Sequence, residues 1–421
     1  MFQPLYSRQS GEFSEDPRLV FIGRSGAAWR EPEPGEMIPM PVGASLVMMP
    51  GHRPVGMDPS TGQPVLVQAG TSATAVAALL PQGYTRTLLP AAAVPQGTPE
   101  LPTLGYTAAA FKNGKIYIAA MKTDRDFAWN PKHYNTERLA DRIAKRLKQS
   151  PKNRILQQLS HCSQVYSCFT AQNVFYERWE GGIPTSPSCN AQCLGCISRS
   201  HTAVCSPQSR LEFLPTSEEI AEVAEHHLSR AGDGIISFGQ GCEGEPSLAA
   251  DRIAPAVKAI RDSVAAGTVN INTNAGNTQG IQKIVDSGLD AMRVTLFSAR
   301  KEDYQQYHQP NYTLEDVAAS IRYAADAGVY ISLNLLTMPG FTDSMDQADA
   351  LLAFIDQLQI PMVQFRNLNL DPVVFESHFP VRSEPIGIPA LIRRLRDAGV
   401  RAASYSHPAR RGAGLIGETN H

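Results

Sequence analysis

Three cysteines, Cys189, Cys193 and Cys196, lie within eight residues of the chain and have the spacing C-x3-C-x2-C. Thiolates bind iron and zinc, and a complete set of protein ligands for an iron–sulfur cube is four cysteines. Three thiolates therefore predict a [4Fe-4S] cluster with one iron left open to another ligand. The alternative is a zinc site that Cys205 or His201 would complete.

A second polar group follows the apolar run Ile235–Ser237, where a buried strand is expected to end. It reads Phe-Gly-Gln-Gly-Cys-Glu-Gly-Glu-Pro and includes Glu243, Gly244 and Glu245. Its glycines let the backbone approach a ligand closely, and its carboxylates accept charge-assisted hydrogen bonds from a cationic group. The segment therefore indicates a binding loop at a strand end. The alternative for Glu245 is a carboxylate that only faces the start of a helix.

At Cys189, Cys193 and Cys196 the chain resembles the radical S-adenosylmethionine superfamily. The resemblance implies that these residues hold the [4Fe-4S] cluster. It also implies that the amino and carboxylate groups of S-adenosylmethionine chelate the open iron. One departure is Gly195, which stands where the family usually has an aromatic residue near the adenine. The residue that contacts adenine is therefore left unassigned.

Further motifs extend the resemblance over residues 183–370. Gly244-Glu245-Pro246 is similar to the family's Gly-Gly-Glu-Pro motif, with Glu243 in place of the first glycine. The resemblance implies that Glu245 and nearby backbone bind the ammonium group of the cofactor, while strand-end positions bind its ribose and carboxylate. Those positions are Thr273, Asn274, Arg293 and Thr295, and Met338-Pro339-Gly340 is similar to a later family turn. Ala275 and Thr295 replace the glycine and serine that the family often has there.

Each of these strand-end residues also has a simpler interpretation. Thr273, Asn274 and Thr295 could be turn formers, and Arg293 could pair with a neighbouring acid. Other polar residues are expected to reach the same cavity and are candidates for substrate contact, with a buried polar network as the alternative: Asn334, Gln364, Arg366, Asn367 and Asn369.

Four cysteines remain outside the triplet: Cys162, Cys168, Cys205 and Cys242. A free cysteine often behaves as a small buried hydrophobe, and this is the first interpretation for each. The alternative is that the four ligate an auxiliary cluster. Cys242 lies at a strand end beside Glu243, so we also consider it a catalytic thiol that quenches or relays a radical.

The elements that must position these residues begin near residue 181. Apolar runs alternate with helical patterns from there on, which is typical of a parallel sheet wrapped by helices. About six β–α units are expected, which favours an incomplete (β/α)6 TIM-like barrel, although a doubly wound open sheet has the same pattern. Thr216 and Thr313 are expected to cap helices. In either fold the chemistry lies at the carboxyl ends of the strands.

The preceding residues have a different character. Dense prolines and glycines separate short apolar runs, and Asn113-Gly114 predicts a type I′ hairpin within residues 106–120. A helix is expected at about residues 136–149. We therefore predict an N-terminal β-rich domain at 1–150, a bridging segment at 151–180, and the partial barrel with a C-terminal extension at 181–421.

Composition limits the classes of partner. The chain has 421 residues and a net charge of −2, so charge gives no case for nucleic acid or an anionic membrane. We find no apolar run of about 18 residues, which a membrane span would need. The start of the chain also lacks the layout of a signal peptide. We therefore expect a cytoplasmic protein. Its seven cysteines are then expected to act as metal ligands or catalytic groups and not to form disulfide bonds.

Together these observations predict an enzyme that cleaves S-adenosylmethionine reductively, using a [4Fe-4S] cluster, to form a 5′-deoxyadenosyl radical. An electron donor such as flavodoxin or ferredoxin is the expected partner, and the substrate is an unidentified small molecule or peptide. The alternative is a non-enzymatic zinc- or iron–sulfur-binding scaffold.

Overall fold

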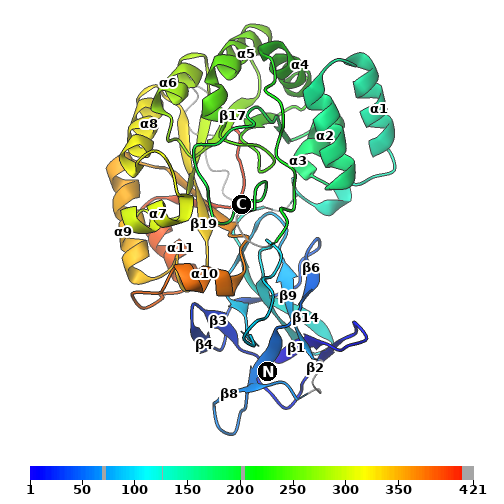
Figure 1. Ribbon diagram of the computed structural model, residues 1–421, viewed down its shortest axis with the longest axis vertical. Helices are drawn as coiled ribbons and strands as arrows, with labels where there is room; N and C mark the ends of the chain where they lie inside the picture. Colours follow the sequence, from blue (N-terminus) through cyan, green and yellow to red (C-terminus); the bar gives the residue numbers. More distant parts are fainter. Residues whose placement is uncertain (69–72, 126, 201–203, 410–421) are drawn as a thin grey trace.

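The computed structural model describes residues 1–68, 73–125, 127–200 and 204–409. It has two parts that differ in architecture (Figure 1). The first is built of antiparallel strands and the second of parallel strands covered by helices. The structure thus confirms an α/β fold with a β-rich N-terminal region and a partial barrel. Within the described residues, no helix has both the length and the apolar character needed to cross a membrane.

The N-terminal part centres on an eight-stranded antiparallel sheet, with a main path in the order β10-β14-β13-β1-β9-β6. Two small three-stranded sheets, β11-β3-β4 and β12-β7-β8, accompany it. Asn113 and Gly114 both have positive φ, of 50° and 76°, so the predicted hairpin between β13 and β14 is confirmed. The strands are β1 Gln3–Ser7, β2 Phe13–Glu15, β3 Gly23–Ser25, β4 Ala28–Arg30, β5 Met37–Pro39, β6 Ser45–Met49, β7 Arg53–Met57, β8 Pro64–Leu66, β9 Thr74–Leu79, β10 Tyr84–Arg86, β11 Leu89–Pro90, β12 Ala92–Ala93, β13 Thr107–Lys112 and β14 Lys115–Lys122.

Helices then lead into the barrel: η1 Pro131–His133, α1 Leu139–Gln149, α2 Arg154–Val165 and α3 Phe169–Tyr176. Apolar side chains of α1, α2 and α3 share one core with the barrel helices and strands. The predicted boundaries at residues 150 and 180 stay a prediction. The helix expected at about 136–149 is present as α1.

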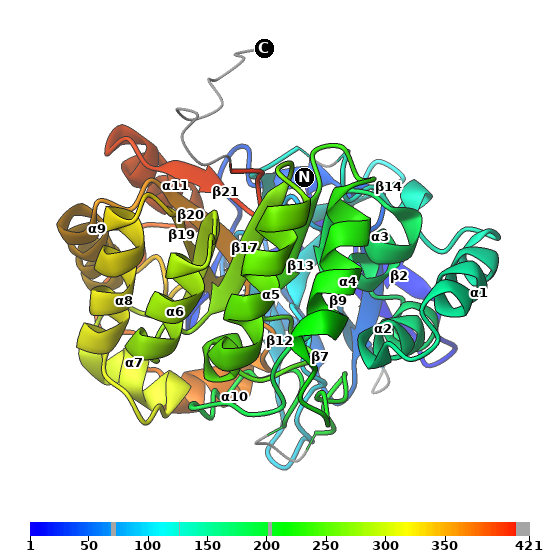
Figure 2. The same ribbon diagram turned by 90° about the horizontal axis from the view of Figure 1, so that it is seen from above.

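The barrel is a seven-stranded parallel sheet in sequential order from β15 to β21. Its elements are β15 Glu180–Gly182, α4 Ser217–Leu228, β16 Ile235–Phe238, η2 Pro246–Ala249, α5 Ala250–Ser263, β17 Thr268–Thr273, α6 Thr278–Asp286, β18 Ala291–Leu296, α7 Lys301–His308, α8 Leu314–Asp326, β19 Tyr330–Thr337, α9 Met345–Leu358, β20 Met362–Asn367, α10 Pro372–His378, α11 Ile388–Asp397 and β21 Arg401–Ala403. Figure 2 shows the helices along the outer face of this curved sheet. Thr216 and Thr313 form the expected caps, each as a capping box that satisfies backbone N–H groups at the helix start.

The barrel stays open because its edge strands, β15 and β21, do not pair in the described sheet. Side chains bridge them instead. Glu180 of β15 accepts a hydrogen bond from Ser406 Oγ, which follows β21, at 2.6 Å. The rings of Trp179 and Tyr405 pack edge to face at 6.1 Å. The two edges therefore enclose a polar interior without a backbone ladder between them.

The N-terminal part packs against the carboxyl end of β20. Asn367 accepts from the Arg86 N–H at 3.0 Å and donates to the Tyr84 carbonyl at 3.1 Å. Arg86 is fully buried, and its guanidinium donates to the carbonyls of Tyr106, Thr337 and Leu368. The β-rich part is thus fixed to the barrel edge where the chemistry of such folds is found.

Candidate functional site

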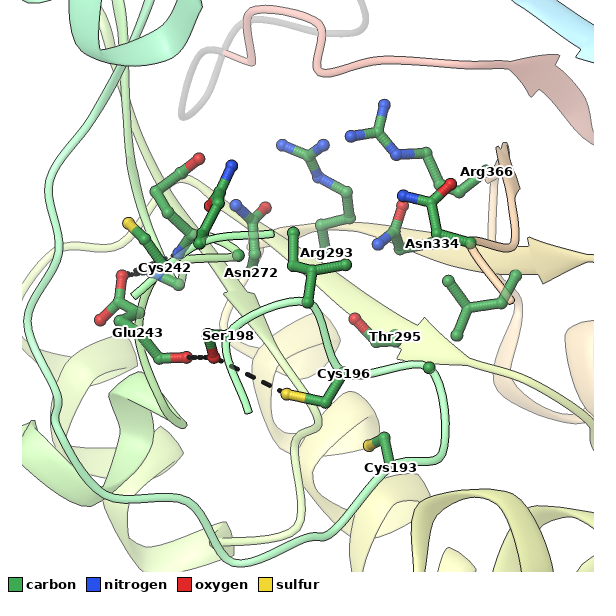
Figure 3. A pocket seen from close by; sticks show the side chains of 18 of the residues that line it. Cys193, Cys196, Ser198, Cys242, Glu243, Asn272, Arg293, Thr295, Asn334 and Arg366 are labelled. Atoms are coloured by element: carbon green, nitrogen blue, oxygen red, sulfur yellow. Dashed lines mark hydrogen bonds between the residues drawn. The ribbon is translucent and has the colours of Figure 1, made fainter. Parts of the chain in front are cut away.

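The predicted site residues converge on one cavity of about 580 Å³, at the carboxyl ends of the barrel strands (Figure 3). Its lining includes every residue predicted to bind the cluster or the cofactor, together with Cys242: Cys189, Cys193, Cys196, Cys242, Gly244, Glu245, Thr273, Asn274, Arg293 and Thr295. Of the candidates for substrate contact, Asn334, Arg366, Asn367 and Asn369 also line it. Gln364 is not among the lining residues and instead donates to Ser332 Oγ at 3.2 Å. The cavity also reaches the N-terminal part through Gln82. The structure therefore places these residues around one cavity, and their roles stay predictions.

The cysteine loop follows β15 and is held by the end of α7. The N–H of Leu194 donates to the Tyr307 carbonyl at 3.1 Å, and the N–H of Gln192 donates to the His308 carbonyl at 2.8 Å. Gly195 is required at its position, because a Cβ there would lie 2.7 Å from Tyr307 Oη. Tyr307 is buried and lines the cavity, so its ring occupies space beside the position where the family has an aromatic residue.

The three thiols are free and partly buried, and polar donors surround two of them. His308 Nδ1 lies 3.2 Å from Cys193 Sγ, while Arg210 Nη2 donates to Cys196 Sγ at 3.4 Å. Burial raises the pKa of Cys189, and burial together with the neighbouring thiols raises that of Cys193. Burial also lowers the pKa of His308 to about 3. Thiolates at these positions would need a bound cation to offset their charge. Hydrogen bonds to the sulfur atoms would then tune the reduction potential of an iron–sulfur cluster.

A cube and a single zinc ion need different arrangements of the ligands. In a zinc site all four ligands surround one point at about 2.0–2.3 Å. Over the ranges that the structure describes, no three His, Cys, Asp or Glu side chains are gathered in this way. In a cube each thiolate binds a different iron, so the thiols lie further apart. Cys205 is exposed and is not among the cavity-lining residues, and His201 lies outside the described residues.

Glu243 and Glu245 are both buried, and each ties loops together. Glu243 accepts from the N–H groups of Gly239 and Gln240 through Oε1, at 2.8 and 2.7 Å. Through Oε2 it accepts from Thr185 N–H and Oγ1 and from Ser186 N–H, at 2.6–2.9 Å. Burial raises the pKa of Glu243 to about 7. This carboxylate joins the loops that follow β15 and β16.

Glu245 caps η2 by accepting from the Ser247 N–H at 3.0 Å. It also accepts from Thr273 Oγ1 at 2.5 Å and from the Asn274 N–H at 2.8 Å. Burial raises its pKa. The structure therefore brings together three residues predicted to bind the cofactor and also engages them with one another. Their role toward the cofactor stays a prediction.

Arg293 and Thr295 project from β18. Arg293 pairs with Glu180 at 2.9 Å, and both side chains are 5% exposed. Thr295 is only partly buried and lines the cavity. Sequence reasoning had considered a neighbouring acid for Arg293 but had not identified Glu180. The motif Glu-Gly-Gly carries little strand signal, so the position of β15 could not be predicted from the sequence.

Cys242 lines the cavity, is 8% exposed, and shares a hydrogen bond with Cys162 of α2. That bond and burial raise the pKa of Cys242, while the same bond lowers the pKa of Cys162. Cys168 also lines the cavity, and its Sγ lies 3.2 Å from Thr170 Oγ1. An auxiliary cluster at these residues, and a catalytic role for Cys242, remain predictions.

Sequence reasoning missed Tyr307, His308 and Arg210, which surround the cysteine loop. Tyr307 and His308 lie at the end of the short helix α7, and His308 is 115 residues further along the chain than Cys193. Contacts of this kind leave no local pattern. The signal available was the aromatic pair Tyr-His at the end of a helix that follows a site strand.

A family model described as the radical SAM superfamily matches residues 183–352. No curated protein sequence matches the chain. Several solved structures are similar to parts of it, with TM-scores below 0.4 for the three described next.

SuiB of Streptococcus suis, solved with the precursor peptide SuiA, has a TM-score of 0.38 and 12% identity, over 60% of this chain and 53% of that one. A radical SAM methyltransferase from Sphaerobacter thermophilus has a TM-score of 0.39 and 15% identity, over 54% and 65%. The coproporphyrinogen III oxidase HemN of Escherichia coli has a TM-score of 0.36 and 14% identity, over 56% and 56%. The chain thus spans between about half and two thirds of these proteins. From the match at residues 183–352, the chain carries a domain of the radical SAM superfamily, whose members use a [4Fe-4S] cluster and S-adenosylmethionine.

Proposed function

We propose that the protein is a radical S-adenosylmethionine enzyme in which Cys189, Cys193 and Cys196 hold three irons of a [4Fe-4S] cluster. One observation carries this proposal. Three free thiols, from a loop within the family match, line the same cavity as the residues predicted to bind the cofactor.

When bound and reduced by an electron carrier such as flavodoxin or ferredoxin, the cluster supplies the electron that cleaves S-adenosylmethionine to methionine and a 5′-deoxyadenosyl radical, which takes hydrogen from a substrate. The residues of the chain position the reactants. The end of α7 holds the cysteine loop through the two backbone hydrogen bonds to Tyr307 and His308. His308 and Arg210 can donate hydrogen bonds to sulfur and offset its negative charge.

The cofactor itself would lie along the ends of β16, β17 and β18. Gly244 lets the loop after β16 pack against the start of the cysteine loop, because a Cβ there would lie 1.9 Å from the Ser188 carbonyl oxygen. We assign Glu245, with Thr273 and Asn274 beside it, to the ammonium end of the cofactor. Thr295, open to the cavity, is assigned to the ribose.

The test is anaerobic incubation of the reconstituted protein with S-adenosylmethionine and dithionite, followed by chromatography and mass spectrometry of the nucleosides. We expect 5′-deoxyadenosine from the wild type and none from Cys193→Ala. Cys205→Ala serves as the matched control and should keep wild-type production, because Cys205 is exposed and not among the cavity-lining residues.

Two outcomes contradict the proposal. One is methylthioadenosine as the only cleavage product, which would show a different reaction of the cofactor. The other is a colourless protein with one zinc ion per chain and no cleavage, which would support the metal-binding scaffold instead.

A further inference from the structure

The wall of the cavity formed by β18, β19 and β20 carries two arginines. Arg293, Asn334 and Arg366 come from these three neighbouring strands and all line the cavity. In Figure 3 both guanidinium groups point to the same side of the cavity, away from Cys193 and Cys196. This wall is therefore a separate polar surface within the same cavity.

The charges on this wall do not balance. Glu180 pairs with Arg293, but no carboxylate among the described residues pairs with Arg366. Arg366 uses one nitrogen, Nη1, for two neutral acceptors, which are Gln82 Oε1 at 2.7 Å and the Ser404 carbonyl at 2.8 Å. Two guanidinium groups thus share a single carboxylate.

The other acids of the cavity do not supply the missing charge. The carboxylates of Glu243 and Glu245 are engaged by amide and hydroxyl donors of nearby loops. The charged groups that act on Arg366 are Arg293, which repels it, and Glu180. Burial and that repulsion lower the pKa of Arg366 to about 10, so the side chain is still a cation at neutral pH.

Removing a charge from water without a partner is costly, and Arg366 is partly buried. Arg86 shows the contrast. It is fully buried and also has no carboxylate partner among the described residues, but its guanidinium donates to three backbone carbonyls and it is not among the residues that line the cavity. Arg366 has fewer acceptors, has Arg293 as a neighbour, and faces open space.

Two more atoms on this wall lack partners. Arg293 Nε and Asn334 Oδ1 are buried, and neither has a hydrogen-bond partner within the described part of the protein. Buried polar groups are almost always satisfied, so unpaired atoms around one cavity indicate that a ligand completes them. Arg293 Nε is a donor that an oxyanion can satisfy, whereas Asn334 Oδ1 is an acceptor and needs a donor, such as a hydroxyl group of the same ligand. The donors available are the planar forks of two arginines, which suit the oxygens of a carboxylate or a phosphate.

We propose that Arg366, on the wall that also carries Arg293 and Asn334, anchors an oxyanion, either a carboxylate or a phosphate, of the molecule that the enzyme modifies. The assignment to the substrate rests on the proposed function, whereas binding of the anion does not. An anchor on this wall would hold the substrate between the cysteine loop and the N-terminal part, which reaches the same wall through Gln82.

The experiment measures anion binding directly. Thermal unfolding of the anaerobically reconstituted protein is followed against rising sodium phosphate or sodium acetate, with sodium chloride at equal ionic strength as reference. An anion that binds the folded protein raises the midpoint, and the concentration dependence gives an apparent dissociation constant. We compare wild type, Arg366→Gln, Arg366→Lys and the control Arg322→Gln, which changes an exposed arginine of α8.

We expect phosphate or acetate to stabilise the wild type and Arg322→Gln above chloride. Arg366→Gln should bind the same anion at least about tenfold more weakly, as expected for the loss of a charge-assisted hydrogen bond. Arg366→Lys keeps the charge but not the fork, so it should be intermediate. Which anion acts identifies carboxylate or phosphate. If Arg366→Gln does not fold, Arg366→Lys alone must still show the weakening.

Affinity for S-adenosylmethionine is measured on the same proteins and should be unchanged in Arg366→Gln. Three results overturn the inference: no stabilisation of the wild type by either anion, equal anion affinity in wild type and Arg366→Gln, or a parallel loss of affinity for S-adenosylmethionine, which would assign the site to the carboxylate of the cofactor. Arg366-dependent anion binding in a protein that cannot cleave S-adenosylmethionine would instead refute the proposed function alone.

Discussion

At the scale of residues, the site contains two buried carboxylates, Glu243 and Glu245, whose contacts differ. Glu243 stands where the family motif has glycine, and within the described residues its carboxylate accepts hydrogen bonds only from the loops after β15 and β16. Glu245 occupies the family position and reaches β17. The departure from the motif therefore adds a structural tie, while Glu245 remains the candidate for the cofactor.

Glu245→Ala is expected to leave the iron content unchanged and to weaken binding of S-adenosylmethionine about ten- to a hundredfold, because a charge-assisted hydrogen bond is lost. Anaerobic titration calorimetry measures this. Glu243→Gln is the matched control, since it changes an equally buried carboxylate with no predicted contact to the cofactor. If the two variants bind the cofactor equally well, Glu245 has only the role of a helix-capping residue.

Cys242 is the candidate for a hydrogen donor to a carbon radical, since it is a buried thiol with a raised pKa that lines the cavity. Without substrate, turnover in D2O should place deuterium in 5′-deoxyadenosine through the exchangeable S–H of this residue. Cys242→Ala should reduce that deuterium content while cleavage continues. Mass spectrometry of the nucleoside measures it.

Cys162→Ala is the control for that experiment, because the free thiol of Cys162 shares a hydrogen bond with that of Cys242 but does not line the cavity. It should keep the wild-type deuterium content. A wild-type content in Cys242→Ala as well would return Cys242 to the class of structural cysteines.

At the scale of elements, the loops after β15 and β16 are clipped together by backbone hydrogen bonds. The N–H of Gly244 donates to the Ser186 carbonyl and that of Glu245 to the Ser188 carbonyl, both at 2.7 Å. Only glycine fits at 244, as the Cβ clash with Ser188 shows. The cysteine loop begins directly after this clip, so its starting position depends on it.

Gly244→Ala is therefore expected to lower the iron content after reconstitution to less than half of the wild-type value, together with the thermal midpoint. Gly114→Ala provides the comparison, since it strains a hairpin turn with a φ of 76° far along the chain from the cysteines. It should lower the midpoint and leave iron binding intact. Full iron binding by Gly244→Ala would show that the clip does not position the cysteine loop.

Short-range sequence patterns, such as apolar runs, helix caps and turn residues, predicted most strands and helices of the barrel. The apolar runs of β16 to β20, the capping boxes at Thr216 and Thr313, and the Asn113-Gly114 turn were all found. β21 was missed because it is only three residues long. The pairing of Glu180 with Arg293 and the clamp by α7 could not be predicted, because each joins residues that are more than 100 positions apart.

At the scale of the whole molecule, the N-terminal part completes the cavity. Gln82 holds Arg366, and the guanidinium of Arg86 bonds to carbonyls beside β19 and β20. The role of this part was left open by its sequence, since short antiparallel strands specify no ligand. Its position now implies that it shapes the space next to the strand ends.

Arg86→Met should lower the free energy of unfolding by about 3 kcal/mol, because it leaves buried carbonyls with fewer donors. Denaturant unfolding followed by circular dichroism and by tryptophan fluorescence measures the change. The control is Arg53→Met at an exposed position of β7, which should change the free energy by less than about 0.5 kcal/mol. Equal stabilities of the two variants would mean that Arg86 does not hold the parts together.

The central claim is that Cys189, Cys193 and Cys196 hold a cluster with one iron open to S-adenosylmethionine. Electron paramagnetic resonance of the reduced, reconstituted protein tests it most directly. The account predicts the signal of a reduced [4Fe-4S] cluster, whose g values change when S-adenosylmethionine is added. It also predicts loss of the signal in Cys193→Ala but not in Cys205→Ala. A cluster signal that S-adenosylmethionine leaves unchanged, or a metal lost equally in both variants, would contradict the account.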